Sequence, residues 1–406
     1  MDRVILHCDC NGFYASVETV LNPELCSVPM AVCGDPKSRH GIILAKNELA
    51  KKYGIKTAET IWQAKRKCPD LVLVLPHHDE YKKYSKQVNL IYQRYTDMVE
   101  PFGIDESWLD VTGSQKLFGS GEEIAARLRR EVREETGLTI SVGVSFNKVF
   151  AKLGSDYKKP DATTVINREN WQQIVWPLPV ESLLYVGESA KRQLGELYIK
   201  TIGDLAQAEQ KAVVKRLGKL GSQLFDYANG IDESPVRRFD EPREIKSVGN
   251  GITFSRDLVG YDDAHVGIAS LCDEVATRLR KHGLCAQTIQ LHLKDTQLKV
   301  ISRQKPLKNA TALSSELAEG AMELLRTSYN GQTPIRMITI TVANLISAEE
   351  AAQQLSFFEQ QPQKREKLHK LENAIDSLRE KYGRNAVSTG AIIGSDIGLS
   401  HSEDES

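Results

Sequence analysis

Three acidic residues constrain this chain more than any other feature. Asp9 ends a short apolar run, residues 4–9, and Asp105 and Glu106 are adjacent within residues 99–110. Carboxylates repel one another, so a fold that gathers three of them usually does so to hold hard divalent cations such as Mg²⁺. The pattern therefore points to phosphoryl transfer. The competing interpretation is structural: an aspartate that caps a turn, and an Asp-Glu pair that is solvated in a hairpin.

Hydrophobic periodicity predicts an α/β unit around these carboxylates. Its expected elements are a strand over 4–9, a helix over 81–95, a strand, turn and strand over 100–111, a helix from a Ser120–Glu123 capping box to Gly137, and a strand over 138–146. This β-α-β-β-α-β order is that of a ferredoxin-like fold. The first strand and the central hairpin are neighbours in such a fold, so we expect Asp9 beside Asp105 and Glu106.

Three motifs resemble those of the Y-family, or translesion, DNA polymerases. They are residues 9–18, residues 104–110, and residues 145–153 followed by Lys158-Lys159-Pro160. The resemblance continues in the same order and spacing to about residue 345, and bacterial members are the most similar. It implies a template-directed DNA polymerase that adds dNTPs to a primer 3′-hydroxyl and releases pyrophosphate. Low processivity, no proofreading and tolerance of damaged templates are further properties that it implies.

The resemblance also implies a multidomain α+β architecture. The palm would be a ferredoxin-like fold with inserted fingers, the thumb a helix-hairpin-helix unit, and the little finger a second ferredoxin-like β-α-β-β-α-β domain. The expected boundaries are palm 1–10 and 77–168, fingers 11–76, thumb 169–232, linker 233–245, little finger 246–346 and C-terminal tail 347–406.

Family membership would give the carboxylates their roles. Asp9 and Asp105 would bridge two Mg²⁺ ions, Glu106 would hold the ion nearest the primer 3′-hydroxyl, and the main-chain carbonyl of Cys10 would add a ligand. Tyr14 would be the steric gate that leaves no room for a ribose 2′-hydroxyl. Packing of this ring in a core is the alternative for Tyr14.

The nucleotide contacts are where the chain departs from the family pattern. The resemblance assigns the dNTP to Phe13, Tyr14, Lys51 and Lys159. Many members have a Ser-Tyr-x-Ala-Arg run, whereas residues 45–51 here read Ala-Lys-Asn-Glu-Leu-Ala-Lys. A lysine cannot form the bidentate fork of an arginine, so we expect the triphosphate to be held differently, with Lys46 as a possible substitute.

DNA contacts are expected from the thumb and the little finger. Residues 178–205 resemble a helix-hairpin-helix in which Gly187 would approach a DNA phosphate and Tyr185 stands where a glycine is usual. In the little finger the candidates for phosphate contacts are Lys246, Arg256, Lys294, Lys299, Arg303 and Lys305. Each alone is better interpreted as a solvated surface charge, and only their concentration on one sheet would make a DNA groove.

The tail contains residues 354–358, Gln-Leu-Ser-Phe-Phe. This run resembles the peptide by which bacterial polymerases bind the β sliding clamp, with Gln354, Leu355, Phe357 and Phe358 as the contacts. Packing of this segment on its own domain is the alternative. Residues 364–382 have the apolar spacing of a short amphipathic helix.

Composition excludes little. The net charge is −1, and residues 349–406 hold 7 Lys and Arg against 11 Asp and Glu, so the acidic excess lies in the tail and does not argue against DNA binding. There is no apolar run of membrane-spanning length, and the N-terminal residues lack a basic region before their short apolar strand, so we expect neither a membrane span nor a signal peptide. Seven scattered cysteines without a C-x-x-C pair suit reduced thiols. We expect a bacterial cytoplasmic monomer, nucleoid-associated when it acts, that binds primer–template DNA and no membrane.

Two other functions stay open at this point. One is a catalytically weak, clamp-docked DNA-binding protein of the same family, which the altered run at 45–51 suggests. The other is a nucleotidyl cyclase, which shares a ferredoxin-like palm with paired carboxylates but needs no thumb or little finger.

Overall fold

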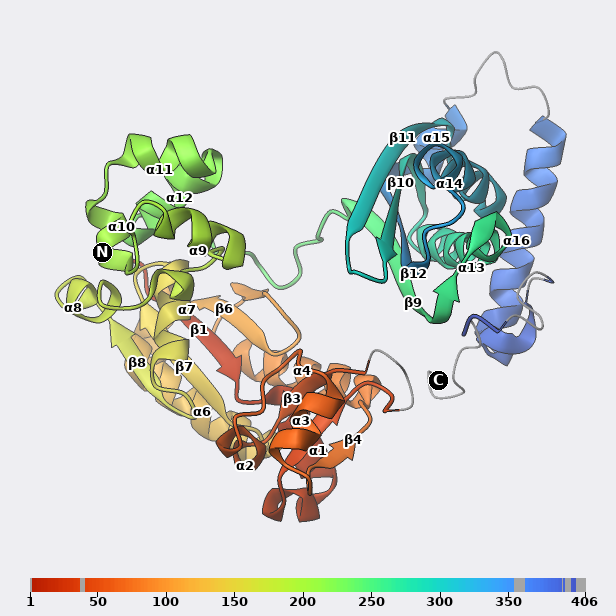
Figure 1. The fold of residues 1–406 in the computed structure, drawn as a ribbon. Coiled ribbons are helices and arrows are strands. Elements are labelled where there is room, and N and C mark those ends of the chain that lie inside the picture. Colours follow the sequence, from red (N-terminus) through yellow and green to blue (C-terminus); the bar gives the residue numbers. More distant parts are fainter. Residues whose placement is uncertain (1, 37–40, 354–361, 389, 391–395, 399–406) are drawn as a thin grey trace. The chain divides into compact units, whose positions relative to one another are not determined.

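The computed structural model describes residues 2–36, 41–353, 362–388, 390 and 396–398. The chain divides into two compact units, Met1–Pro242 and Arg243–Ser406, and each is described by itself. Both units combine sheets with helices (Figure 1), which confirms the multidomain α+β class. In the part of the chain that the structure describes, no helix is both long and apolar enough to cross a membrane.

A five-stranded sheet forms the centre of the first unit. Its strands, in spatial order, are β5 (Val99–Pro101), β6 (Glu106–Asp110), β1 (Ile5–Cys10), β7 (Ile140–Ser145) and β8 (Thr163–Ile166). β1 is antiparallel to both β6 and β7, and β8 is added in parallel to β7. Apart from β8, this is the ferredoxin-like strand order that the sequence predicts. The central position of β1 brings the end of the first strand next to the β5–β6 turn.

Helices cover both faces of this sheet. They are α4 (His78–Tyr92), the short α5 (Gln115–Phe118), α6 (Gly121–Thr136) and α7 (Lys148–Tyr157). Apolar residues of α4 and α6 share one buried cluster with Leu6 and Leu109, whereas α7 packs on the opposite face with Ile5 and Trp108. The capping box predicted at Ser120 is present.

Gly143 allows α7 to approach the sheet closely. A Cβ atom at this position of β7 would lie 1.9 Å from the carbonyl oxygen of Ala151 and 2.5 Å from the backbone nitrogen of Ser155. No side chain fits in that space, so the backbones of β7 and α7 are nearly in contact. This close packing brings the side chains of α7 over the strand ends that carry the carboxylates.

A smaller sheet follows β1 in sequence. Its strands are ordered β3 (Ile43–Lys46), β2 (Met30–Cys33) and β4 (Val72–Val74). The helices of this region are α1 (Phe13–Leu21), α2 (Glu48–Lys52) and α3 (Ile61–Lys67), with a 3₁₀ turn at Pro23–Ser27. α1 begins directly after β1 and therefore joins the two sheets at the carboxylate end of β1.

The remaining part of the first unit is helical. It contains α8 (Trp171–Val175), α9 (Glu188–Gly195), α10 (Ile202–Gln207), α11 (Gln210–Leu217) and α12 (Lys219–Ala228), packed in an apolar cluster that they share with α7. The chain then returns to the five-stranded sheet: Val236 is buried with Ile5 and Trp108, and the backbone N–H of Phe239 donates to the carbonyl of Asp97 at 3.2 Å. The first half of the segment expected as a linker therefore packs against the first unit.

The second unit is built on a four-stranded antiparallel sheet. Its elements in chain order are β9 (Ser247–Leu258), α13 (Gly260–Lys281), β10 (Leu284–Asp295), β11 (Val300–Thr311), α14 (Ser314–Ser328) and β12 (Ile335–Ser347). The predicted β-α-β-β-α-β order is present, but the spatial order is β11-β10-β12-β9. The second and fourth strands are central here, whereas the first and third are central in a ferredoxin-like sheet. The expected ferredoxin-like pairing is therefore corrected for this unit.

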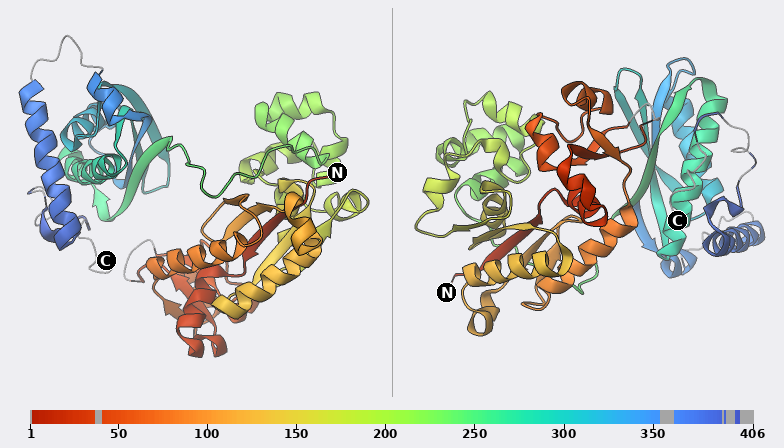
Figure 2. Two further views of the ribbon diagram at one scale, coloured as in Figure 1. Left: turned by 180° about the vertical axis from the view of Figure 1, so that it is seen from behind. Right: turned by 90° about the horizontal axis from the view of Figure 1, so that it is seen from below.

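Two further helices complete the second unit, α15 (Ala348–Gln353) and α16 (Pro362–Tyr382). α16 lies on the helical side of the sheet, beside α13 (Figures 1 and 2). The guanidinium of Arg280, from α13, pairs with the carboxylates of Glu372 and Asp376 of α16. Glu372 also accepts hydrogen bonds from the backbone N–H and hydroxyl of Ser314, at the start of α14. The helix predicted in the tail is thus an integral part of this unit.

Candidate active site

The three predicted carboxylates meet at one end of the five-stranded sheet. Asp9 lies directly opposite Glu106 in the β1–β6 register. Asp105 precedes β6, and its carbonyl accepts a hydrogen bond from the backbone N–H of Cys10 at 2.9 Å. All four residues line a cavity of about 460 Å³. Strand pairing alone therefore brings together residues that are far apart in the sequence.

The protonation equilibria of the cluster are strongly perturbed. Burial raises the pKa of Asp105, and the charges of Asp9 and Glu106 raise it further, to about 6. Burial also raises the pKa of Asp9, although the ammonium of Lys159 opposes this. A carboxyl group whose ionisation is resisted by two neighbouring carboxylates gains from a nearby cation. The donor set, three carboxylates and a main-chain carbonyl, fits a hard divalent cation.

Lys159 supplies positive charge to the same cavity. Its Nζ is 2.9 Å from Oδ2 of Asp9 and 2.7 Å from Oδ1 of Asp156. Burial would lower the pKa of Lys159, but these two carboxylates raise it above its ordinary value. The assignment of Lys159 to a triphosphate stays a prediction, and the position of its ammonium in the cavity is compatible with it.

Glu106 has two partners that sequence reasoning did not identify. The Nζ of Lys152 is 2.6 Å from Oε2 of Glu106, and Nε2 of His7 is 3.3 Å from the same oxygen. Burial alone would raise the pKa of Glu106, but the adjacent imidazole of His7 and the ammonium of Lys152 bring it to about 2. Desolvation lowers the pKa of the fully buried His7. His7 lies in the predicted strand over 4–9 and Lys152 in the motif over 145–153, but nothing in the sequence shows which way they point.

Tyr14 stacks on another aromatic ring at the edge of the cavity. Its ring lies 4.1 Å from that of Tyr81, with 14° between the planes. The Tyr81 hydroxyl donates to Glu18 at 2.5 Å. The side chain of Phe13, in contrast, is buried in the core beneath α1, although the residue borders the cavity. The gate function of Tyr14 stays a prediction, and Tyr81 is a support that the sequence did not reveal.

The small sheet contributes a different lysine from the one expected. Lys51 is exposed and pairs with Glu48 at 3.4 Å, one helical turn away. Lys46 lines the cavity, and its Nζ donates to the hydroxyl of Thr57 at 3.2 Å. Burial and then the charge of Lys51 lower the pKa of Lys46. The assignment of Lys51 to the nucleotide is untested, but Lys46 is the residue that the fold presents to the cavity.

The residues expected to contact DNA from the helical part are at its surface. Gly187 is the N-cap of α9, and Tyr185 has a backbone φ of 72°, in the left-handed region that favours glycine. The structure thus explains why glycine is usual at the position of Tyr185. Its ring is about half exposed. The role of Gly187 in DNA binding stays a prediction.

The basic residues of the second unit do not gather on one face. Arg303 lies directly opposite the buried Leu291 in the β10–β11 register, so its side chain leaves the sheet on the helical side. Arg256 is engaged by two carboxylates, those of Asp263 and Asp396. Lys246 is exposed before β9. The open face of the sheet carries mostly neutral polar side chains; those of the two central strands include Gln290, His292, Thr339 and Thr341, and Lys294 lies on the same face, two residues beyond His292.

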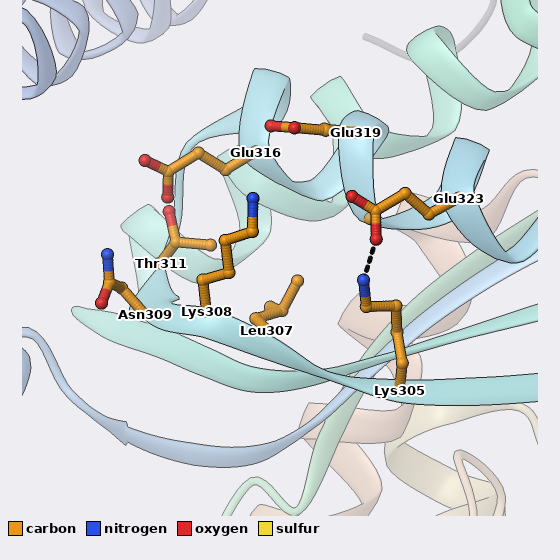
Figure 3. Close-up of a pocket in the computed structure, with 9 residues that line it drawn as sticks. Lys305, Leu307, Lys308, Asn309, Thr311, Glu316, Glu319 and Glu323 are labelled. Atoms are coloured by element: carbon orange, nitrogen blue, oxygen red, sulfur yellow. Dashed lines mark hydrogen bonds and ion pairs between the residues drawn. The ribbon is translucent and has the colours of Figure 1, made fainter. Parts of the chain in front are cut away.

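Lys305 belongs to a second cavity, of about 120 Å³, between β11 and α14. Figure 3 shows its ammonium paired with Glu323 and Lys308 extending from the same strand toward α14. Glu316 and Glu319 line the same cavity. The two lysines of this cavity face three glutamates, so the cavity offers a phosphate no excess of positive charge. The clamp-like residues Gln354, Leu355, Phe357 and Phe358 lie outside the described residues.

Two sequence families match the chain. The impB/mucB/samB family matches residues 8–156, and the C-terminal domain of the same family matches residues 245–357. A protein named DNA polymerase IV from Acetivibrio thermocellus is 47% identical over 97% of this chain and 98% of its own length. A second, with the same name, from Clostridium kluyveri is 36% identical over 97% and 99%.

A solved structure has the same fold. A Y-family DNA polymerase chimera superimposes with a TM-score of 0.73 and covers 85% of this chain and 99% of its own. Its sequence is 24% identical to this one. The structural likeness supports the architecture, and the sequence relatives carry the evidence for the family.

Proposed function

Because the chain belongs to the impB/mucB/samB family of Y-family DNA polymerases, we propose that it copies damaged templates by metal-assisted nucleotidyl transfer at the carboxylate cavity. The chain is a DNA-directed DNA polymerase of the translesion family. The proposal adds the mechanism and the residues. One observation carries it: Asp9, Asp105 and Glu106 line one cavity together with Tyr14, Lys46 and Lys159.

The carboxylates would hold two divalent cations. Mg²⁺ is the cation that we propose, because it prefers hard oxygen ligands. Asp9, Asp105 and Glu106 would hold the ions, with Glu106 on the side of the primer 3′-hydroxyl. Bound there, the ions would lower the pKa of that hydroxyl and neutralise the leaving pyrophosphate. The role of the protein is to place the carboxylates, which β1 and β6 do by direct pairing. The carbonyl of Cys10 would complete the ligand set.

The lysines of the cavity would hold the triphosphate. Lys159 reaches the cavity from the segment after α7, and Lys46 from the end of β3. The hydroxyl of Thr57, which accepts from Lys46 at 3.2 Å, would fix the ammonium or turn to donate to a phosphate oxygen. Lys46 and Thr57 would together replace the Tyr and Arg that many members carry. The alternative of a catalytically weak protein rested on the loss of that arginine. Lys46 would supply a positive charge to the triphosphate in its place, so this reason for the alternative no longer applies.

Tyr14 would select deoxynucleotides by occupying the space of a 2′-hydroxyl. DNA would be held by backbone groups near Gly187 and by the second unit, whose open sheet face carries mostly neutral polar groups. We also propose that residues 354–358 bind the sliding clamp, which would offset the low processivity of an enzyme without proofreading. This last proposal rests on the sequence alone, and a clamp-binding assay of the Phe357→Ala/Phe358→Ala variant tests it.

Primer extension tests the central proposal. The assay would compare the native protein with Asp105→Ala/Glu106→Ala on a labelled primer–template with four dNTPs and Mg²⁺, alongside DNA binding by both. Because catalysis here depends on positioning and charge neutralisation, we expect the variant to lose extension by orders of magnitude and to keep DNA binding. Equal extension by both proteins would remove the carboxylates from the mechanism.

A further inference from the structure

Helix α7 sends two lysines to two carboxylates of the β5–β6 hairpin. Lys148 pairs with Glu100 at 2.8 Å, over the ring of Trp108, and Lys152 pairs with Glu106 at 2.6 Å. The two lysines are one helical turn apart and face the same way. Their partners differ in location: Glu106 lines the carboxylate cavity, whereas Glu100 belongs to β5, the far strand of the hairpin.

The position of Lys152 is fixed by a closed set of contacts. Its Nζ contacts Oε2 of Glu106, and Nε2 of His7 lies 3.3 Å from that same oxygen. On the other side of the imidazole, Nδ1 is 2.8 Å from the hydroxyl of Ser155, which donates to the carbonyl of Lys152 at 2.8 Å. The ring of Phe102 lies 5.7 Å from the ammonium. The lysine side chain is 20% exposed and that of Glu106 17%, so water screens the pair only weakly.

An ammonium held in this way acts on any cation that Glu106 binds. It already neutralises the carboxylate, and it repels a second positive charge at a few ångströms. We propose that Lys152 is an internal counter-ion that keeps divalent cations weakly bound at Glu106 until primer and dNTP add their negative charge. The ammonium thus makes filling of this position depend on the substrates. The inference rests on the proposed role of Glu106 as a metal ligand.

Binding of Mn²⁺ to the full chain tests this, because free Mn²⁺ is counted by its paramagnetic resonance signal without any turnover. The proteins are the native chain, Lys152→Met, Lys152→Arg, the matched control Lys148→Met, and Asp105→Ala/Glu106→Ala, which lacks two of the proposed metal ligands. Each is titrated alone and again with a dideoxy-terminated primer–template and the matching dNTP. Removing one nearby positive charge should tighten Mn²⁺ binding to the protein alone by about tenfold.

The comparison between the two titrations carries the rest of the prediction. The difference in Mn²⁺ affinity between Lys152→Met and the native chain should shrink when primer and dNTP are present, since their phosphates offset the ammonium in the native protein. Lys152→Arg, which keeps the charge, and Lys148→Met should bind Mn²⁺ as the native chain does. If Lys152→Met does not fold, Lys152→Gln replaces it, with thermal unfolding recorded for every variant.

Two results would overturn the inference, and they are distinguishable. Unchanged or weaker Mn²⁺ binding by Lys152→Met, or no binding by either protein alone, means that Lys152 does not control the site. Full Mn²⁺ affinity in Asp105→Ala/Glu106→Ala would remove the metal site itself and the proposed mechanism with it. A structural role of Lys152 would weaken metal binding and stability together, which is opposite in sign to the expected result.

Discussion

The ring of Tyr14 stacks on the ring of Tyr81, 4.1 Å away and nearly parallel. Tyr81 is fully buried, and its hydroxyl is held by Glu18, a buried carboxylate that also contacts Nδ1 of His77 at 2.9 Å. The floor of the nucleotide sugar pocket would therefore have two layers: the partly exposed ring of Tyr14 and, beneath it, the buried ring of Tyr81 that holds it in place. A steric gate works only if its ring cannot move aside.

The first prediction is that Tyr81 supports sugar selection through Tyr14. Tyr14→Ala should admit ribonucleotides, and Tyr81→Leu should lower the dNTP over rNTP ratio of kcat/KM by about tenfold, because the loosened ring yields to a 2′-hydroxyl. Single-nucleotide insertion kinetics with dCTP and CTP measure the ratio. In the Tyr14→Ala background, Tyr81→Leu should change the ratio no further.

Tyr92→Leu is the control for this prediction. Tyr92 is buried in the same helix and the same core cluster as Tyr81. Its replacement should cost stability without altering the ratio between sugars. An equal loss of sugar selection in both leucine variants would show that the effect is general loosening of the core.

The second prediction separates the two lysines of the small sheet. Lys46→Met should raise KM for the dNTP by roughly tenfold, since a cation that meets the triphosphate is lost. Lys51→Met should leave KM near its native value, because Lys51 is solvated and paired with Glu48. Steady-state kinetics on one primer–template measure both. The reverse ranking would return the triphosphate contact to Lys51.

The third prediction concerns Asp105, whose pKa is raised to about 6 by burial and then by Asp9 and Glu106. A raised pKa means that the native state binds the proton more tightly than the unfolded state. The contribution of Asp105 to stability is therefore present in acid and is lost as the pH rises through about 6. Asp105→Asn removes this cost of ionisation.

Asp105→Asn should accordingly stabilise the protein above pH 6 in metal-free buffer, by about 1 to 3 kcal/mol at pH 8. The gain should vanish near pH 4, where Asp105 is protonated in the native state. Thermal unfolding across this pH range, in the presence of a chelator, measures the difference. Added Mg²⁺ should raise the Tm of the native protein and not that of the variant. An equal rise in Tm of the variant would show that the cations bind elsewhere.

Much of the first unit could be predicted because local patterns determine it. The capping box at Ser120 starts α6 and Gly137 ends it, and the apolar run of β1 places Asp9 near its end. The first sheet adopts the ferredoxin-like arrangement, one that this element order allows, and the meeting of Asp9 with Glu106 follows from that strand order. In each step the information lies within a few residues or in a connection rule.

Side-chain direction and long-range partners could not be predicted. His7 lies in the predicted strand and Lys152 in the third motif, but their contact with Glu106 depends on how α7 packs closely on the sheet at Gly143. Lys46 and Lys51 are both lysines of the same short run, and the sequence does not show which of them faces the cavity. In the structure it is Lys46, the last residue of β3. The second sheet has the element order of the first, but that order allows two strand arrangements, and the sequence does not distinguish them.

The docking of α16 was also beyond the sequence, because its partners are distant. Amphipathic spacing predicted a helix, but not that its carboxylates would meet a buried arginine. Arg280 has 8% of its side chain exposed and Glu372 10%. α14 begins without a side-chain cap of its own, and Glu372 accepts from Ser314 at 3.1 Å and 2.6 Å in its place. One glutamate therefore both pairs a buried cation and satisfies the start of a helix.

The last prediction is that Glu372→Gln destabilises the second unit strongly. The change leaves Arg280 with half of its carboxylate partners and replaces a charged acceptor at α14 with a weaker one, so the free energy of unfolding should fall by about 2 to 4 kcal/mol. Glu366→Gln, on the exposed side of α16 where Glu366 pairs with Lys370, is the control and should leave Tm unchanged. Chemical denaturation of the full chain, followed by proteolysis to assign the unit that opens first, measures both. Native stability in Glu372→Gln would mean that α16 is held by its apolar contacts and that the ion pairs only set its register.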